Sequence, residues 1–411
     1  MNKSILKDIL FSQDKFKKKD VVLRDLFLSV QKEISSPFVV VVSGVRRCGK
    51  STLLLEIKKN AYYVNFDDER FIGFTVKDFS VLEEILLELF GVRDFFIFDE
   101  IQNILGWERF VRRLHESGKK VFVTGSNATM LSRELGTHLT GRTINYNLFP
   151  FSFKEFLRFN NEEINSNNFS LENRAKLKKY FLEYFEFGGF PEYLKTKNKL
   201  YLQSLYENIV YKDIIVRYNL PSEQMLKQAF FYAISNIGKL LSYNQVRKIT
   251  GLSSATTIKE YFSYAQNSFL FFEVAKFDKS LKNQFYANKK VYCIDNALAS
   301  LIGFRFSKDS GRLLENIVFL ELKRMSKEIY YYKEKFECDF VIKKGLNIVE
   351  AIQVCYQLNE ENKVREISGL IDACKTHNLK EGLLLTFDDE EVLQKDGIKV
   401  IVKPVWKWLL E

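Results

Sequence analysis

Short runs of consecutive apolar residues, separated by stretches with helical periodicity, dominate residues 38–149. The runs are FVVVVS (38–43), AYYVNFDD (61–68), DFFIFDE (94–100) and KKVFVTGSN (119–127). Strands that are apolar without alternation are buried on both faces, and parallel strands need a helix-sized connection between them. The pattern therefore predicts an α/β domain in which helices cover both faces of a parallel sheet.

The pattern changes at Pro150. The next stretch, to about Asn219, has helical periodicity and many Phe and Tyr residues, and a compact helical segment then ends in the apolar run FLFFEVAKF. Residues 281–411 return to mixed helix and strand, with a helix over 311–325 and strands at YYYK, CDFVIKK, IVEAIQV, GLLLTF and KVIV. We therefore divide the chain into an α/β core (1–149), a helical lid (150–220), a compact helical segment (221–280) and a small α/β domain (281–411).

Composition excludes several classes of protein. The three histidines, His115, His138 and His377, have no ligand spacing, which argues against a zinc hydrolase. No apolar run reaches the ~18 residues of a membrane span, and the N-terminus does not read as a signal peptide. The five cysteines contain no CxxC pair, so we expect a reducing, cytoplasmic setting. The net charge of +10 suits nucleic acid or another polyanion.

Residues 44–51, Gly-Val-Arg-Arg-Cys-Gly-Lys-Ser, match the pattern GxxxxGK[ST] in full, between an apolar strand and the helical stretch STLLLEIKK. The glycines let the backbone curl, so that its N–H groups and the helix N-terminus face a phosphate chain. Lys50 then reaches the β- and γ-phosphates, and Ser51 offers a hydroxyl to Mg²⁺. We expect ATP and Mg²⁺ at this P-loop, bound by Gly44, Arg46, Arg47, Cys48, Gly49, Lys50, Ser51 and Thr52.

A second motif lies at the end of the strand FFIFDE, where two acids follow four apolar residues. We expect Asp99 to hold the Mg²⁺ shell and Glu100 to orient and deprotonate the attacking water. An adjacent acid of this kind is typical of ATP-hydrolysing motors and switches. The sequence therefore predicts an ATPase.

Two further positions each leave two interpretations open. Ser126 and Asn127 end the strand VFVTGSN, where they would contact the γ-phosphate or the attacking water, or would only cap the helix ATMLSREL. Arg142, in LTGRT, would act as an arginine finger on a neighbouring subunit's nucleotide, or would pair locally at the surface.

The order GVRRCGKST, IFDE, VTGSN and LTGR resembles that of the AAA+ and STAND-like P-loop ATPases, and most closely a widespread archaeal and bacterial ATPase family. Members of that family follow the core with a segment like LFPFSFKEFL and a glycine-proline motif, here FGGFPE at 187–192. The resemblance implies that Gly189 and Pro191 contact adenine, as a similar element does in STAND ATPases. A helix C-cap and turn is the other interpretation.

Residues 236–278 predict a winged helix-turn-helix. Ser242 begins a helix that Gly251 ends, and Ser253 or Ser254 begins a second helix before an apolar hairpin-like run. Residues 231–290 contain nine Lys and Arg against three Asp and Glu, a net charge of +6. Lys259 is the one basic residue of the second helix, so we expect non-specific contact with the DNA backbone. A lid or a protein-docking unit is the alternative.

The last segment resembles the restriction-endonuclease-like fold through Glu315 on a helix and Asp339 and Glu350 on strands. The resemblance implies that active members bind Mg²⁺ with a helix acid, an Asp and an E-x-K strand. Here the strand reads VEAIQV, without a lysine. Side chains alternate along a strand, so Glu350 and Gln353 cannot share a face without a bulge, and either alignment removes one catalytic group. We expect a vestigial nuclease fold that does not cut.

Three functions remain open at this stage. An ATP-driven motor would assemble into a ring or dimer on DNA, with Arg142 acting between subunits. A STAND-like switch would hold nucleotide in a closed state and act on a protein partner. A binding module of a defence or toxin–antitoxin system would hydrolyse ATP only incidentally.

Overall fold

The computed structural model describes residues 1–411 apart from 15–20, 59, 128–138, 140, 163–169, 222 and 305–309. The chain divides into two units, Met1–Phe149 and Pro150–Glu411. Each unit has its own sheet or sheets and its own core. Within the described ranges, no helix is long and apolar enough to cross a membrane.

The first unit contains a five-stranded sheet in the order β2-β3-β4-β1-β5, and every pairing in it is parallel. The parallel sheet predicted from the apolar runs is therefore confirmed. The pattern did not predict β5, whose side chains alternate between exposed and half-buried. The strands are β1 (Val39–Gly44), β2 (Tyr62–Asn65), β3 (Phe95–Asp99), β4 (Lys120–Gly125) and β5 (Thr143–Leu148).

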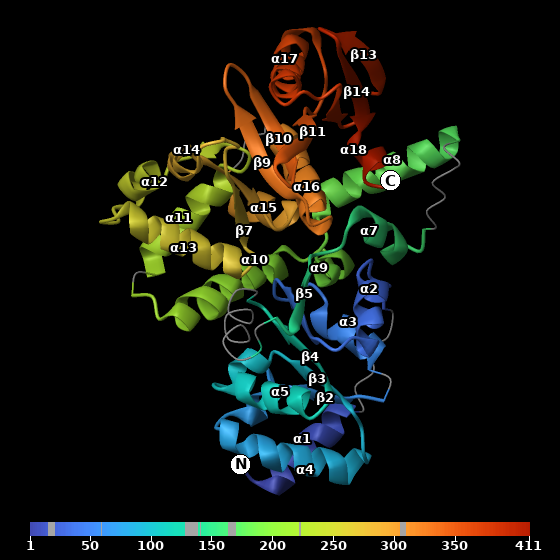
Figure 1. The fold of residues 1–411 in the computed structure, drawn as a ribbon, viewed down its shortest axis with the longest axis vertical. Coiled ribbons are helices and arrows are strands. Elements are labelled where there is room, and N and C mark those ends of the chain that lie inside the picture. The colour runs from blue at the N-terminus through green and yellow to red at the C-terminus, as the bar shows by residue number, and fades with distance from the viewer. Residues whose placement is uncertain are drawn as a thin grey trace. The chain divides into compact units, whose positions relative to one another are not determined.

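Helices cover this sheet because its strands present apolar side chains on both faces. Helices α1, α4 and α5 lie beside the sheet (Figure 1). Alternate residues of the strands, such as Val41, Phe98 and Val123, form one buried cluster with side chains of these helices. The residues between them, such as Val42 and Phe122, are equally buried. The helices are α1 (Lys3–Asp14), α2 (Phe27–Lys32), α3 (Lys50–Ile57), α4 (Phe79–Phe90) and α5 (Trp107–Glu116), with 3₁₀ turns at Glu33–Ser35, Glu69–Phe71, Val76–Asp78 and Ile101–Asn103.

The second unit begins with helices that continue to residue 235. A capping box starts the first of them, because the Ser152 hydroxyl accepts from the Glu155 N–H and the Glu155 carboxylate accepts from the Ser152 N–H. The helices are α7 (Phe153–Phe159), α8 (Leu171–Phe187), α9 (Pro191–Thr196), α10 (Lys199–Asn208), the π-helical η5 (Ile209–Val216) and α11 (Glu223–Ser235).

A helix-turn-helix and a three-stranded antiparallel sheet follow α11. Gly251, at φ +72°, ends α12 (Tyr243–Thr250), and the Ser254 hydroxyl caps α13 (Ala255–Asn267). The sheet has the order β6-β8-β7 and consists of β6 (Leu240–Leu241), β7 (Phe271–Val274) and β8 (Lys289–Cys293). The short helix α14 (Leu281–Tyr286) connects β7 to β8. The sheet thus extends past residue 280, where the sequence pattern placed a boundary.

The rest of the unit contains a six-stranded mixed sheet in the order β13-β14-β12-β11-β10-β9. Side chains of α17 pack on β10, β11 and β12 in one buried cluster. The elements are α15 (Asn296–Ile302), α16 (Ser310–Arg324), β9 (Glu328–Lys333), β10 (Glu337–Lys344), β11 (Asn347–Val354), α17 (Glu360–Thr376), β12 (Glu381–Thr386), β13 (Glu391–Lys395), β14 (Ile398–Pro404) and α18 (Val405–Trp408).

Two glycines of the FGGFPE motif lie at a close contact inside this unit. The Gly189 carbonyl accepts from the Phe151 N–H at 2.8 Å, and the Gly189 N–H donates to Asp295 at 2.6 Å. A Cβ on Gly189 would lie 2.4 Å from the Phe151 carbonyl oxygen, and one on Gly188 would lie 2.2 Å from Asp295. The motif therefore has a structural role in joining the start of α7, the end of α8 and the start of α15.

We predict that Gly189→Ala destabilises the second unit by roughly 2–4 kcal/mol, because backbone atoms cannot move away from the new Cβ as a flexible side chain can. Gly311→Ala on α16 is the matched control, since a Cβ there meets nothing within 4 Å. Urea unfolding followed by circular dichroism measures both. Equal stability of the two variants would contradict the packing role of Gly189.

Candidate functional site

The loop between β1 and α3 lies against the neighbouring strand β5. A Cβ on Gly44 would lie 2.2 Å from the Leu148 carbonyl oxygen, so only glycine permits this approach. Gly49, at φ +105°, and Arg47, at φ +66°, turn the loop through the left-handed region before α3 begins at Lys50. The predicted strand–loop–helix context of the motif is present.

Buried contacts on the far side of the loop fix its position. Arg24, 5% exposed, donates to the Cys48 carbonyl at 2.7 Å and to the Phe149 carbonyl at 2.6 Å. The Cys48 thiol donates to the Leu148 carbonyl at 3.3 Å. Burial raises the pKa of the Cys48 thiol, although Lys50 and Arg24 oppose the rise. Cys48 is therefore a packing residue of the loop rather than a nucleophile.

Lys50 is buried, and its ammonium lies between backbone carbonyls and a carboxylate. Its Nζ donates to the carbonyls of Gly44 and Val45 at 3.1 and 3.3 Å and lies 3.2 Å from Glu100 Oε1. Burial alone would lower the pKa of Lys50, but the charges of Glu100, Cys48 and Asp99 and the hydrogen bond to Glu100 together outweigh burial, and the pKa is raised. The lysine thus holds a positive charge beside the backbone carbonyls of the loop.

Asp99 ends β3 and is fully buried among hydroxyl groups. The Tyr63 hydroxyl donates to it at 2.7 Å, and the hydroxyls of Thr124 and Ser51 also bind it. Burial, and then the charge of Glu100, raise the pKa of Asp99 despite these hydrogen bonds. A buried carboxylate beside a second acid and the first-turn hydroxyl of α3 is a fitting ligand set for Mg²⁺.

Glu100 has a strained backbone that aims its carboxylate at Lys50. Its φ is +51°, which is uncommon for a residue other than glycine. Its N–H donates to the Thr124 hydroxyl at 2.9 Å, and the Gln102 amide donates to its carboxylate at 2.6 Å. Burial would raise the pKa of Glu100, but Lys50 and Gln102 lower it, so the group is ionised and able to accept a proton.

A cavity of about 400 Å³ lies beside the first turn of α3. Ser51, Thr52 and Arg47 of the motif line it, together with Tyr63 from β2. Its remaining lining residues are Ser12, Gln13, Leu55, Asn65, Asp68 and Arg70. Arg46 lies near this region too, with a guanidinium nitrogen 3.9 Å from Asp67.

The other expected residues of the first unit lie at the carboxyl ends of the strands or at the surface. Ser126 and Asn127 follow β4 and are buried, but the helix that they would cap falls in 128–138, outside the described residues. Arg142 is exposed, and one of its guanidinium nitrogens lies 3.9 Å from Glu116. This matches local pairing, and its role between subunits stays a prediction.

Gly189 and Pro191 belong to the second unit, where Gly189 makes the backbone contacts described above and Pro191 begins α9. The turn interpretation of this motif accounts for these contacts. Their contact with adenine stays a prediction.

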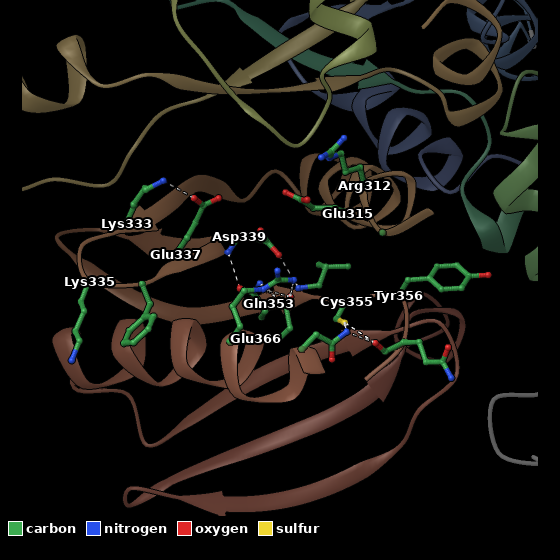
Figure 2. A pocket seen from close by; sticks show the side chains of 16 residues that line it. Arg312, Glu315, Lys333, Lys335, Glu337, Asp339, Gln353, Cys355, Tyr356 and Glu366 are labelled. Atoms are coloured by element: carbon green, nitrogen blue, oxygen red, sulfur yellow. Dashed lines mark hydrogen bonds and ion pairs between the residues drawn. The ribbon is translucent and has the colours of Figure 1, made fainter. Parts of the chain in front are cut away.

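The expected nuclease residues separate into two places. Glu315, Asp339 and Gln353 line a cavity of about 770 Å³ and face it together (Figure 2). Glu350 does not line it, and its carboxylate lies 2.6 Å from the Lys327 ammonium. The pairing of β11 with β10 runs without a register shift from Glu350 to Ile352, so Ala351 and Gln353 share the face of the strand opposite to that of Glu350.

Three residues that the sequence pattern did not single out contribute to the site of the first unit. Tyr63, Thr124 and Arg24 support the phosphate loop and the acid pair. Each is a lone polar residue, and the first two lie within apolar strands, so no spacing marks them.

The chain matches known families over most of its length. Residues 36–157 match an AAA domain, residues 178–308 a domain of unknown function (DUF8612), and residues 310–406 another (DUF4143). The chain is 34% identical over 418 residues to the uncharacterized protein MJ1544 of Methanocaldococcus jannaschii, covering 96% of this chain and 92% of that one. It is 32% identical over 398 residues to an uncharacterized protein of Haemophilus influenzae, covering 91% and 94%.

Solved structures also match, at low similarity. The Walker-type ATPase PABY2304 of Pyrococcus abyssi has a TM-score of 0.46 and 16% identity, covering 70% of this chain and 97% of that one. The STAND protein PH0952 of Pyrococcus horikoshii, with a tetratricopeptide repeat sensor, has a TM-score of 0.27 and 15% identity, covering 75% and 46%. Its similarity along nearly the full length shows that the chain belongs to one family with these M. jannaschii and H. influenzae proteins, and its AAA domain makes it an AAA-type, nucleotide-binding ATPase.

Proposed function

We propose that the protein binds ATP with Mg²⁺ at the loop 44–51 and hydrolyses it with Glu100 as the general base. The contact between Lys50 and Glu100 supports this best, because it joins the phosphate-binding lysine to the water-activating acid. In this structure the two charges satisfy each other. ATP would offer Lys50 better partners and thereby free Glu100.

The chemistry follows from these positions. Lys50 would leave Glu100 for oxygens of the β- and γ-phosphates, and the Gln102 amide would keep the freed carboxylate in place. The water oxygen then attacks the γ-phosphorus, its proton passes to Glu100, and the bond to the β,γ-bridging oxygen breaks to give ADP and phosphate. Mg²⁺, when bound by Ser51 and Asp99, neutralises charge on the phosphates.

The two members of the ion pair should fail in different ways. Lys50→Ala is expected to weaken ATP binding by about 10²-fold or more, because the variant loses the buried ammonium that would contact the β- and γ-phosphates. Glu100→Gln should keep or improve ATP affinity, since Lys50 loses its competing partner, while turnover falls by about 10²–10⁴-fold. Calorimetry and phosphate release measure the two effects.

Glu69→Gln is the matched control, because Glu69 is an exposed glutamate. This substitution should change neither the affinity for ATP nor the rate of ATP hydrolysis. Wild-type ATP affinity in Lys50→Ala, or unchanged turnover in Glu100→Gln, would overturn the assigned roles.

Thr124 has one hydroxyl that serves both acids, because it donates to Asp99 and accepts from the Glu100 N–H. Thr124→Val keeps the shape and removes the hydroxyl, so we expect about a 10–100-fold loss of Mg²⁺-dependent activity with little change in folding. Activity titrated against Mg²⁺ measures this loss. Thr143→Val on β5 of the same sheet is the control, and equal Mg²⁺ dependence of the two variants would refute the role of Thr124.

We further propose that the helix-turn-helix contacts DNA through its backbone. The succession α11, β6, α12, α13, β7, β8, with sheet order β6-β8-β7, supports the winged-helix interpretation. Lys259 on α13 and Lys248 on α12 are exposed. A protein-docking role for this segment is the alternative, and it predicts no affinity for DNA.

If the contact is with phosphates, Lys259→Ala should weaken binding to all duplexes about equally and flatten the log–log salt dependence by about one unit. Fluorescence anisotropy at several salt concentrations gives the slope. Lys227→Ala on α11, which removes a lysine paired with Glu223 in its own helix, is the matched control. A loss that depends on DNA sequence would point instead to base readout.

A further inference from the structure

Lys290 on β8 is buried, and its ammonium lies among three carboxylates. Its Nζ is 2.8 Å from Asp339 Oδ1, 3.0 Å from Glu337 Oε1 and 3.1 Å from Glu315 Oε1. Only 1% of its side chain is exposed. The lysine comes from the β6-β8-β7 sheet, whereas the acids come from α16 and from β10 of the six-stranded sheet.

Other hydrogen bonds hold two of these carboxylates in place. The Tyr292 hydroxyl donates to Glu315 at 2.6 Å, and the Val354 N–H donates to Asp339 Oδ2 at 3.0 Å. Asp339 therefore presents its other oxygen, Oδ1, to the lysine.

Gln353 is held in the same network. Its side-chain carbonyl accepts from the Asp339 N–H at 3.1 Å, and its amide donates to Glu366 at 2.7 Å (Figure 2). The glutamine thus links Asp339 to Glu366. Because its amide is uncharged, it adds no second positive charge to the cluster.

Three carboxylate oxygens converging on one point are the donor set that a hard divalent cation prefers, and here an ammonium fills that point. The three carboxylate oxygens lie 2.8–3.1 Å from the lysine Nζ, which are hydrogen-bond distances and longer than the ~2.0–2.6 Å between Mg²⁺ or Ca²⁺ and its ligands. Within the described residues, no group of three or more His, Cys, Asp or Glu is arranged to hold a metal ion.

The contacts of the lysine balance the charge of the acids. Its ammonium lies within 3.1 Å of one oxygen from each of three carboxylates, so these charges compensate one another in the interior. Lys290 therefore occupies the point toward which the three acids converge.

We propose that Lys290 is the built-in cation of this carboxylate site and takes the place of a divalent metal ion. The natural protein then binds no metal there and cannot use these acids for metal-dependent phosphodiester cleavage. The same contact ties the sheet of the helix-turn-helix to the six-stranded sheet. This inference is independent of the proposed ATPase mechanism.

Lys290→Met tests the proposal, because it removes the charge and nearly keeps the shape. We expect the variant to melt at a lower temperature, to bind one additional Mn²⁺ per chain, and to recover stability when Mn²⁺ is added. Electron paramagnetic resonance of free Mn²⁺, on nucleotide-free full-length protein, counts the bound ions. The phosphate loop is unchanged in all variants, so its contribution cancels.

Two variants make the assignment specific. Lys333→Met removes another cation that contacts the carboxylate cluster, 3.0 Å from Glu337, and should bind no additional Mn²⁺. Adding Asp339→Asn to Lys290→Met should abolish the gained site. A folded Lys290→Met protein that gains no Mn²⁺ would overturn the proposal.

Measurements on protein that retains Lys290 keep the test decisive even if Lys290→Met does not fold. Wild type and Asp339→Asn should bind the same number of Mn²⁺ ions. Loss of a bound ion in Asp339→Asn would show that the natural site already holds metal, and the proposal would be wrong.

Discussion

A buried ammonium must be paired, because an uncompensated charge in the interior costs several kcal/mol. Among the residues that the structure describes, two lysines are buried, Lys50 in the first unit and Lys290 in the second. Lys50 has one carboxylate partner and two carbonyls, so an incoming phosphate chain can replace its carboxylate. Lys290 has three carboxylates, two of them also held by Tyr292 and Val354, so more contacts must break to release it. On this difference we base the proposals of a nucleotide site at Lys50 and a metal-free site at Lys290.

Strand order explains how the first site is assembled. The carboxyl ends of parallel strands meet at one edge of a sheet, and β4 lies between β1 and β3. Thr124, near the end of β4, therefore reaches both Asp99 and Glu100 at the end of β3. The left-handed backbone at Glu100 turns its side chain toward Lys50, at the start of α3. Sheet topology thus brings together groups that lie some 25–50 residues apart in the chain.

The local patterns of the sequence predicted the phosphate loop, the acid pair and most strands, because each lies in one contiguous segment with its own spacing. Strand β5 was missed because its alternating TINYNL carries no apolar run. Lys290 was counted only as part of a basic segment, since its partners Glu315 and Asp339 follow 25 and 49 residues later and no local pattern joins them. The sequence alone leaves open whether Glu350 or Gln353 lies with Asp339, whereas in the structure the Asp339 N–H donates to the Gln353 side chain and Glu350 pairs with Lys327.

We propose that nucleotide binding exchanges the partner of Lys50 and so releases Glu100. A crystal structure with Mg²⁺ and a non-hydrolysable ATP analogue would reveal this exchange. We expect Lys50 Nζ to leave Glu100 and to lie within about 3 Å of β- and γ-phosphate oxygens, with the Glu100 carboxylate facing the γ-phosphate. A bound analogue with the Lys50–Glu100 contact still at its present 3.2 Å would contradict it.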